Sequence, residues 1–590
     1  MRHVLALTVF APALAVVLLA SCGTVPEPSP TTDLPIWLRS PILDGTRESD
    51  DDPASIVPAD ATLYVRIENG GGILDADETD PLAREAWNAI QGLIPAGFWR
   101  GSAPQLGLDE RALLRELFTR DLVLVDQSIA ATRRLVVLSR VSEKILRDLP
   151  AAARLEPWPL QERVGPYRLW RGESEGKAYL IALGERWLAF TSVDGADHIR
   201  RLLVARSAGE PTLDANDAYR DLLSRLPAER RAVMFTQTAD GSQAHALVLI
   251  GNAPRYEARY AARAPDVEKY VDAVAAKQKL DFGPLPDDVV AAGAVNVLTH
   301  EVPSEGVLDM LLFPHSFRAR IWERIEPPVL FFLGRLPRAE IAPDPGFDVP
   351  VFGIAVRLEN DDVARDLDRV CSGIHFLVSL GQLALAEGFF GVEEVKAGGV
   401  EYHRADFGPV LRATGNDSLL GKLANAPSAR GLTQIAYGRV DDYYVICTQE
   451  AFLRRWRDAS RSAMTRLTSA RDFGAFEFEE RDGLIFSALT RGPELSKLVD
   501  EAIAFLRESR DGETGARVEP DATSVTNDDG EAPEGDGAAG DSGPDDDDGA
   551  ARIERPLRWL AGGLEQSSTF SVQVWHGADG LLYGRLLVLR

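Results

Sequence analysis

The chain has 590 residues, 45% of them hydrophobic, and a formal net charge of −26 at neutral pH. This length and apolar content are enough for the cores of two to four domains. The acidic balance argues against nucleic acid as a partner and disfavours adhesion to anionic lipid, because both need Lys and Arg clustered on one face. Half of the charge lies in residues 511–550, where 14 Asp or Glu stand against one Arg, a net of −13.

The N-terminus has the order of a bacterial export signal. Arg2 supplies the positive charge, residues 4–20 form an apolar run, and small residues precede Cys22. The run barely reaches the length needed to cross a bilayer of about 30 Å, and Pro12 interrupts it. We therefore expect a cleaved signal rather than a permanent transmembrane helix.

The residues Leu19-Ala20-Ser21-Cys22 resemble the lipobox of bacterial lipoproteins. The resemblance implies that residues 1–21 are a signal peptide, and that Cys22 becomes acylated and holds the protein at a membrane. Several acyl chains, at about 0.8 kcal/mol per buried methylene, make a durable anchor. Gly23 stands where the family's inner-membrane retention signal has Asp, so the family rule favours the outer membrane of the cell envelope. The alternative is an ordinary cleaved signal in which Cys22 is incidental.

Residues 22–54 predict a tether between this anchor and the folded part. The segment is rich in Pro, Ser and Thr, and it ends near the acidic run 50–52. Such a composition cannot bury a core and stays extended. Its prolines are Pro26, Pro28, Pro30, Pro35, Pro41 and Pro53.

Two long segments, residues 55–280 and 281–590, contain similar motifs in the same order. Part of the similarity keeps a constant offset of 254 residues. The matches pair Val57-Pro58-Ala59-Asp60 with Leu285-Pro286-Asp287-Asp288, 135–137 with 354–356, 147–149 with 365–367, Tyr167 with Tyr402, 187–192 with 443–448, Ile199-Arg200-Arg201-Leu202 with Leu453-Arg454-Arg455-Trp456, Leu213 with Leu467, Tyr219 with Phe473, and 232–236 with 484–487. We interpret the shared order as an internal duplication. The alternative is a coincidence of a common strand and helix pattern.

Within each half, short β-rich runs alternate with helical patterns. Pairs of runs joined by Gly-rich turns, such as 167–170 with 178–183, predict hairpins and therefore antiparallel sheet. The predicted fold class is α+β, with two related tandem domains, each with helices packed on a mainly antiparallel sheet. Predicted helices in the first half are 82–93, 110–118, 196–203 and 217–226.

The second half is predicted to contain a disordered acidic insertion, residues 511–550, which follows a helical pattern at 494–506. It is an insertion and not a tail, because runs 570–575 and 581–589 form a closing hairpin after it. The Leu/Val-Pro-x-Asp opening of each half, followed by a Tyr-bearing strand, resembles an uncharacterised family of bacterial envelope proteins. That resemblance implies a fold and an envelope address, and no activity.

No motif supports a catalytic, cofactor-binding or metal site, so we assign no residue to any of these roles. Gly172-Glu173-Ser174-Glu175-Gly176 fits the Gly-x-Ser-x-Gly pattern of hydrolases, but a strand follows where a nucleophile elbow needs a helix, so we interpret it as a hairpin turn. The acidic runs lack the spacing of a calcium loop, and residues 70–72 lack that of a phosphate loop. The histidines stand alone, without zinc-ligand spacing; in the mature chain they are His198, His245, His300, His315, His375, His403 and His576.

Three further features have a structural interpretation. The run 329–333 is expected to be a core strand, with a docking surface as the alternative. The Arg pairs 200–201 and 454–455 are expected on solvated helix faces. Cys371 and Cys447 fall in a helical and a strand-like pattern, which favours buried free thiols, although an exported protein also permits a disulfide between them.

These observations favour a non-catalytic lipoprotein that binds or scaffolds, with the membrane through Cys22 and an envelope protein as its expected partners. Two alternatives stay open. One is an envelope hydrolase with carboxylates brought together from distant parts of the chain. The other is a receptor that closes its two halves around a small ligand.

Overall fold

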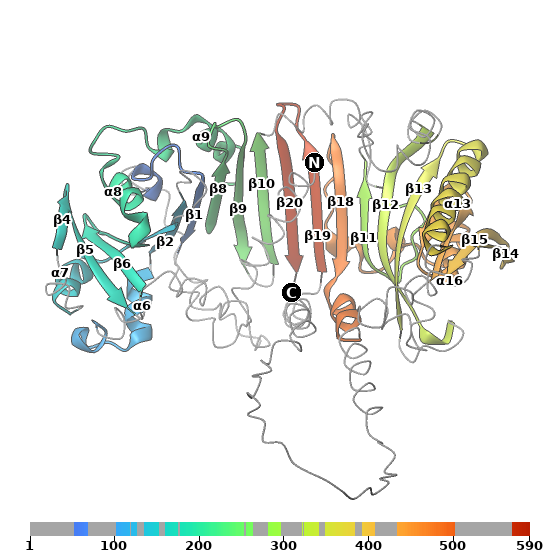
Figure 1. Cartoon of the computed structure of the whole chain (residues 1–590), viewed down its shortest axis with the longest axis horizontal. Coiled ribbons are helices and arrows are strands. Elements are labelled where there is room, and N and C mark those ends of the chain that lie inside the picture. The colour runs from blue at the N-terminus through green and yellow to red at the C-terminus, as the bar shows by residue number, and fades with distance from the viewer. Residues whose placement is uncertain are drawn as a thin grey trace, which may run out of the picture.

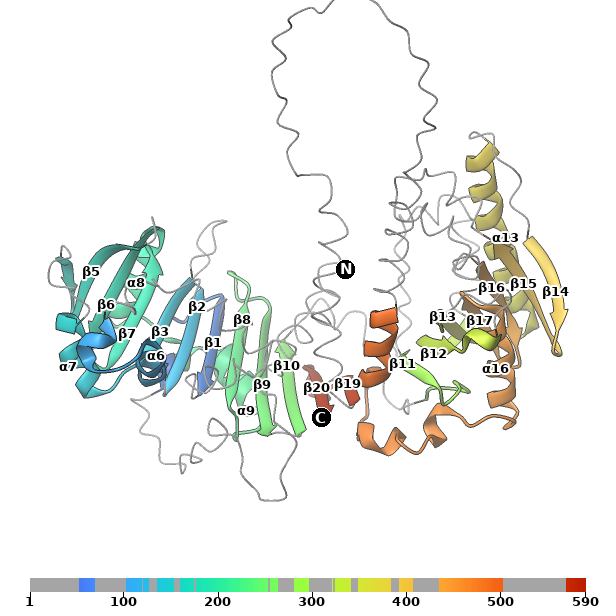
Figure 2. The ribbon, with the colours of Figure 1, turned by 90° about the horizontal axis from the view of Figure 1, so that it is seen from below.

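The structure, a computed structural model, is an α+β fold built on one antiparallel sheet of 20 strands, which stand in a single row (Figure 1). The row curves, so that both of its outer ends lie on the same side of its middle (Figure 2). The structure describes residues 52–68, 102–118, 120–126, 135–152, 160–174, 177–252, 255–263, 281–296, 321, 324–340, 348–383, 392–406, 434–501 and 569–589. Cys22, the signal peptide, nearly all of the tether, the expected helix 82–93 and the tract 511–550 lie outside these residues. None of the helices in the described ranges combines the length and the apolar character that a membrane span requires.

The strands follow one spatial order in which all neighbours are antiparallel. From one edge to the middle, the sheet contains β4 (Leu160–Val164), β5 (Tyr167–Ser174), β6 (Lys177–Gly184), β7 (Trp187–Ser192), β3 (Leu135–Arg140), β2 (Asp121–Asp126), β1 (Leu63–Glu68), β8 (Ala232–Gln237), β9 (Ala244–Asn252) and β10 (Arg255–Arg263). From the middle to the other edge it contains β20 (Leu582–Leu589), β19 (Thr569–His576), β18 (Leu484–Arg491), β11 (Val289–Val295), β12 (Ile325–Leu336), β13 (Val349–Leu358), β17 (Tyr443–Cys447), β16 (Gln434–Val440), β15 (Val400–Asp406) and β14 (Val392–Ala397). The two halves of the row meet where β10 pairs with β20.

Helices cover both faces of the sheet away from its middle. The first face, as we call it, carries α8 (Ala196–Val204), α9 (Asp217–Ser224) and α16 (Glu450–Ser460), whose apolar side chains enter two large cores. The second face carries α6 (Glu110–Phe118), α7 (Glu143–Ala152) and α13 (Asp361–Leu383). The sequence predicted the bounds of α6 correctly and those of α8 and α9 to within two residues. The predicted hairpins are confirmed as β5–β6 and β19–β20.

Side-chain alternation along the central strands separates an apolar from a polar side. On β10, Ala258, Tyr260 and Ala262 belong to an apolar cluster of the second face. The residues that alternate with them include Glu257 and Arg259, which therefore lie on the first face. The first face thus has two apolar cores with a polar stripe between them, at the middle of the sheet.

Local signals in the sequence place the helix that flanks this stripe. The side chain of Asn216 accepts a hydrogen bond of 3.0 Å from the backbone N–H of Tyr219 and so caps the start of α9. Tyr219, Leu222 and Leu223 then form the buried side of the helix. The loop after α9 reaches the middle of the sheet as a result.

Candidate functional site

The pairing of β10 with β20, which we call the seam, brings like charges together. In its register Arg259 lies directly opposite Arg585. Like charges in such a cross-strand pair repel each other, so the seam needs carboxylates nearby to be stable. It obtains them from β10 itself and from the loop that precedes β18.

The innermost ion pair joins Arg585 to Glu257. Their side chains are only 5% and 8% exposed, and Arg585 Nε lies 3.1 Å from Glu257 Oε1. Glu257 also pairs with Arg255 at 3.3 Å and with Arg259. A buried charge is tolerated only when it is paired and hydrogen-bonded, and each of these two charges has more than one partner.

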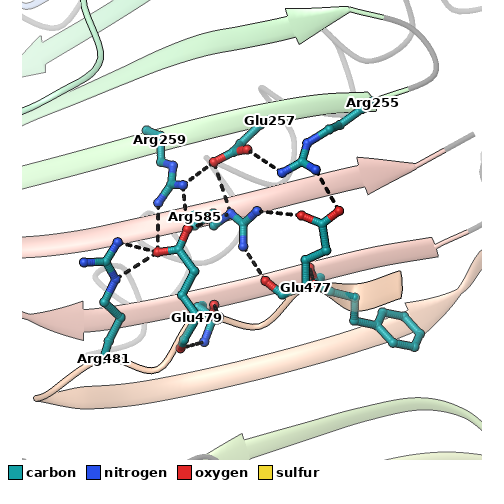
Figure 3. Close-up of polar contacts among 10 residues, drawn as sticks. Arg255, Glu257, Arg259, Glu477, Glu479, Arg481 and Arg585 are labelled. Carbon is teal, nitrogen blue, oxygen red and sulfur yellow. Dashed lines mark hydrogen bonds and ion pairs between the residues drawn. The ribbon is translucent and has the colours of Figure 1, made fainter. Parts of the chain in front are cut away.

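Residues 477–481, which belong to the same half of the chain as Arg585, lie over this pair. Glu477 lies 2.7 Å from Arg255, and Glu479 lies 2.7 Å from Arg259 (Figure 3). Arg585 donates a hydrogen bond to the backbone carbonyl of Glu477. We call the whole set the seam cluster; it consists of Arg255, Glu257, Arg259, Glu477, Glu479, Arg481 and Arg585.

The position of this loop is fixed by two polar side chains of β19. Gln573 Oε1 accepts a hydrogen bond of 2.8 Å from the backbone N–H of Glu479, and Gln573 Nε2 donates one of 2.9 Å to its carbonyl. Ser571 donates a hydrogen bond of 2.7 Å to the carbonyl of Phe476. Both side chains are buried. The seam cluster is therefore held by a second layer of hydrogen bonds.

Two carboxylates of the seam cluster, Glu257 and Glu479, have lowered pKa values and are charged at neutral pH. Partial burial alone would raise the pKa of Glu479, but hydrogen bonds from Arg259 and Arg481 outweigh it and lower that pKa to about 2. Burial opposes ionisation of Glu257 too, yet Arg259 and Arg585 lower its pKa below the ordinary value. Neither carboxyl group holds a proton that it could give to a substrate.

A cavity of about 570 Å³ lies beside the seam cluster on the first face. On one side it is lined by Leu226 and Pro227 of the loop after α9, and by Ile250 of β9. On the other side it is lined by Trp575 and Tyr583. We call this cavity the seam groove, because both halves of the chain supply its walls.

The aromatic wall of the seam groove is ordered by its own contacts. The rings of Trp575 and Tyr583 are 5.9 Å apart between centroids, at an angle of 16°. The guanidinium of Arg481 lies 5.1 Å above the Trp575 ring, at the distance of a cation–π contact. Arg225 lies at the mouth and contacts Asp579 at 3.2 Å. The groove therefore combines aliphatic, aromatic and cationic surfaces.

A second cavity, of about 540 Å³, lies in the second half and is lined by charged side chains including Asp368 and His403. Nearby, the hydroxyl of Tyr444 donates a hydrogen bond of 2.7 Å to Asp368. His403 Nε2 is 3.7 Å from Asp368, beyond hydrogen-bond distance. Burial raises the pKa of the neighbouring Cys371 thiol to about 11, so this thiol is not an activated nucleophile.

Cys447 and the serine motif agree with the sequence interpretation, whereas Cys371 is a free thiol that is only partly buried. Cys371 and Cys447 are free thiols, and they pack in cores on opposite faces of the sheet. Ser174 ends β5 opposite Lys177, the first residue of β6, so the motif lies in a hairpin. Cys22, the expected lipidation site, lies outside the described residues. Within the described ranges, no three or more His, Cys, Asp or Glu are grouped so that they could hold a metal ion.

Two expectations need correction. The expectation of a solvated helix face is wrong for Arg455, which is only 12% exposed and pairs with Asp288. Arg201 does lie on a solvated face, where it pairs with Asp60 at 2.8 Å. The run 329–333 is a core strand on one side only: Leu330 and Phe332 are buried in β12, but Phe331 is 43% exposed.

Sequence reasoning missed the seam cluster altogether. A usable signal was present in β10, where Arg255, Glu257 and Arg259 occupy alternate positions of a strand and so share one face. The second signal was Arg585, a lone charge in the apolar run 581–589. Comparison with known proteins adds no further assignment: no family model, curated protein or solved structure matches this chain.

Proposed function

We propose that this chain is a lipid-anchored lipoprotein of the bacterial cell envelope that acts by binding, and that its two halves are related tandem copies which share the seam groove as their binding site. The observation that carries the proposal is the groove itself. Its walls come from both halves, and it adjoins the buried ion pair of Arg585 with Glu257. A preformed concave site with a few placed polar groups is the usual form of a small-ligand site.

Repeated contacts support the relation between the halves. The backbone N–H of Leu213 donates to the carbonyl of Val57, and that of Leu467 donates to the carbonyl of Leu285, both at 2.7 Å. The sequence matches pair these same residues. Isolated β-bridges join Pro58 to Thr212 and Pro286 to Arg466 at the same places.

Side chains repeat these contacts even where their types differ. Gln237 Nε2 donates to the carbonyls of Ala59 and Ala61. Arg491, at the corresponding position 254 residues later, donates to the carbonyls of Asp287 and Val289. Unrelated strand and helix patterns would not reproduce individual hydrogen bonds in this way.

The match of Tyr167 with Tyr402 is off by two residues. In equivalent hairpins, Val164 pairs with Tyr167 and Ala397 pairs with Val400. Val400 therefore occupies the position of Tyr167, and Tyr402 lies two residues further along its strand.

The seam constrains how the protein binds. β10 and β20 are paired along eight residue pairs, from Arg255 with Leu589 to Ala262 with Leu582. A receptor that closed its halves by hinge motion would have to break this ladder. We therefore propose a groove that is open and preformed, which reduces the ordering cost of binding.

The hydrolase alternative receives no support from the seam. A general acid must hold its proton at working pH, and so must have a raised pKa. The pKa values of Glu257 and Glu479 are lowered instead. Binding without chemistry is the function that fits these carboxylates.

The proposed address comes from the sequence alone. Cys22 and the tether would hold the sheet away from the bilayer; a Pro-rich segment of 30 residues reaches up to about 90 Å. Mass spectrometry of the mature protein should find an acylated Cys22 at its N-terminus, and Cys22→Ser should release the protein from the membrane fraction. Cys371→Ser is the control and should leave it there. An unmodified Cys22 would contradict the anchoring.

Binding is tested separately, with protein that lacks the lipid. A thermal-shift screen of metabolites should reveal at least one that raises the Tm, because a ligand that binds only the folded state stabilises it. Trp575→Leu should abolish that shift. A screen with no hit, or a hit that is insensitive to Trp575, would contradict a binding site in the seam groove.

A further inference from the structure

We infer that the seam groove takes a ring-bearing organic anion, meaning a carboxylate carried on an aromatic ring or on a sugar ring, and holds it in one orientation. The inference rests on the proposed binding function and names its ligand class. It follows from how the two halves differ at the places where their positions correspond.

The groove lies on the axis that relates the two halves. Gln237 and Arg491 correspond through the offset of 254, as do Thr212 and Arg466. No net insertion separates these positions, so Pro227 corresponds to Arg481.

Strand register extends the correspondence to the central strands. Ala232 corresponds to Phe486 through the offset of 254, two residues beyond the start of the matched run 484–487. Leu249 pairs with Ala232, and Val574 pairs with Phe486, so Leu249 corresponds to Val574. The next residues, Ile250 and Trp575, are therefore counterparts. Ile250 pairs with Glu257 as Trp575 pairs with Tyr583, so these last two residues also correspond. By the same step Arg259 corresponds to Arg585, and these two face each other across the seam.

Two identical halves would give a groove with two equal walls. Here the walls are opposite in character. The first half supplies aliphatic Pro227 and Ile250, whereas the second half supplies Arg481 and Trp575 at the same positions. A ligand that prefers one wall therefore has only one way to lie in the groove.

The wall of the second half suits a ring. Trp575 and Tyr583 are cross-strand partners whose rings are stacked, with centroids 5.9 Å and planes 16° apart, so they form one ordered aromatic wall. Such a wall packs against an aromatic ring or the apolar face of a sugar ring, whose polar edge stays available for hydrogen bonds. The aliphatic wall opposite closes the space above such a ring.

One guanidinium at the groove keeps a donor for an anion. The lining contains Arg225, Arg259 and Arg481 and one carboxylate, Glu257. Arg225 is paired with Asp579, and Arg259 is paired with Glu257 and Glu479. Arg481 uses Nε and Nη2 on Glu479, which leaves Nη1 for a ligand. A carboxylate accepts such donors well because an arginine fork matches its geometry.

The test uses isothermal titration calorimetry on the soluble chain with four probes. These are 2-naphthoate and glucuronate, and their uncharged counterparts 2-naphthamide and glucose. We expect at least one anion to bind at least tenfold more tightly than its counterpart. The naphthoate and glucuronate arms distinguish an aromatic from a sugar source of the ring.

Variants locate the site. Arg481→Gln should weaken binding of the anion at least tenfold, and Trp575→Leu should weaken binding of the anion and of its counterpart alike. Arg461→Gln is the matched control, because Arg461 is also a partly exposed arginine but lines the second cavity. It should leave the affinity unchanged.

The outcomes separate the two proposals. If uncharged probes bind as tightly as anions, or if only other metabolites from the thermal-shift screen bind at Trp575, the ligand class is wrong and the groove remains a binding site. If binding of an anion survives both Arg481→Gln and Trp575→Leu, the inference is overturned. If neither probes nor metabolites bind, the proposed function itself fails.

Discussion

The most direct test of the seam is Arg585→Met, which keeps an unbranched apolar stem and removes the guanidinium with its charge. Arg585 is 5% exposed and lies 3.1 Å from Glu257 and 3.5 Å from Glu479. Removing one partner of a buried ion pair costs about 3 to 5 kcal/mol. Because Glu257 keeps Arg255 and Arg259, we expect the lower end of that range, about 3 kcal/mol.

Urea denaturation should show this loss, and hydrogen exchange should locate it at the amides of β10 and β20. The double variant Arg585→Met with Glu257→Met should recover at least half of the stability, since the buried carboxylate that lost its least exposed partner is then gone. Arg461→Gln, on the surface, should change stability by no more than about 0.5 kcal/mol. A loss below about 1 kcal/mol for the single variant, or a double variant worse than the single, would refute the reasoning.

Three further outcomes follow from the geometry. Arg455→Ala should lower the free energy of unfolding by about 2 kcal/mol and Arg201→Ala by less than about 1 kcal/mol. The reason is burial, because the Arg455 side chain is 12% exposed and that of Arg201 is 34% exposed. Chemical denaturation compares the two variants, and equal losses would contradict the difference in burial. The pKa of Glu479 is lowered to about 2, so its ionised form stabilises the fold above the ordinary Glu pKa. The free energy of unfolding should hold from pH 7 to about 5 and fall as the pH drops toward 2. A Glu479→Gln variant should show a shallower fall, and an unchanged pH profile would argue against this role. Burial raises the pKa of Cys371 to about 11 and of Cys447 to about 12, so iodoacetamide at pH 8 should label both slowly in the native protein and rapidly in urea; rapid native labelling would contradict their burial.

Much of the fold could be predicted from the sequence because its signals are local. The helix at residues 110–118 and the hairpin of β19 with β20 arise from periodicity and turn residues within about 20 positions. The shared motifs also pair residues that make similar hydrogen bonds in the structure, Leu213 with Val57 and Leu467 with Leu285.

The seam could not be predicted, because it joins residues more than 300 positions apart. Nothing near Arg585 in the sequence indicates that Glu257 is its partner. A charged residue in an apolar strand cannot be assigned a partner until the neighbouring strand is known. Arg455 was misjudged for the same reason: its partner Asp288 lies far away along the chain.

The pairing of β10 with β20 also determines which strand edges are exposed for self-association. By pairing with each other, β10 and β20 hide what would otherwise be two open strand edges, one of them ending in the apolar run 586–589. Among the described strands only β4 and β14 remain at the ends of the row, and β14 bears Glu393, Glu394 and Lys396, charges that discourage a foreign strand from adding to it. A protease cut that separated the two halves would uncover both hidden edges at once, and the fragments would then be prone to aggregate through them.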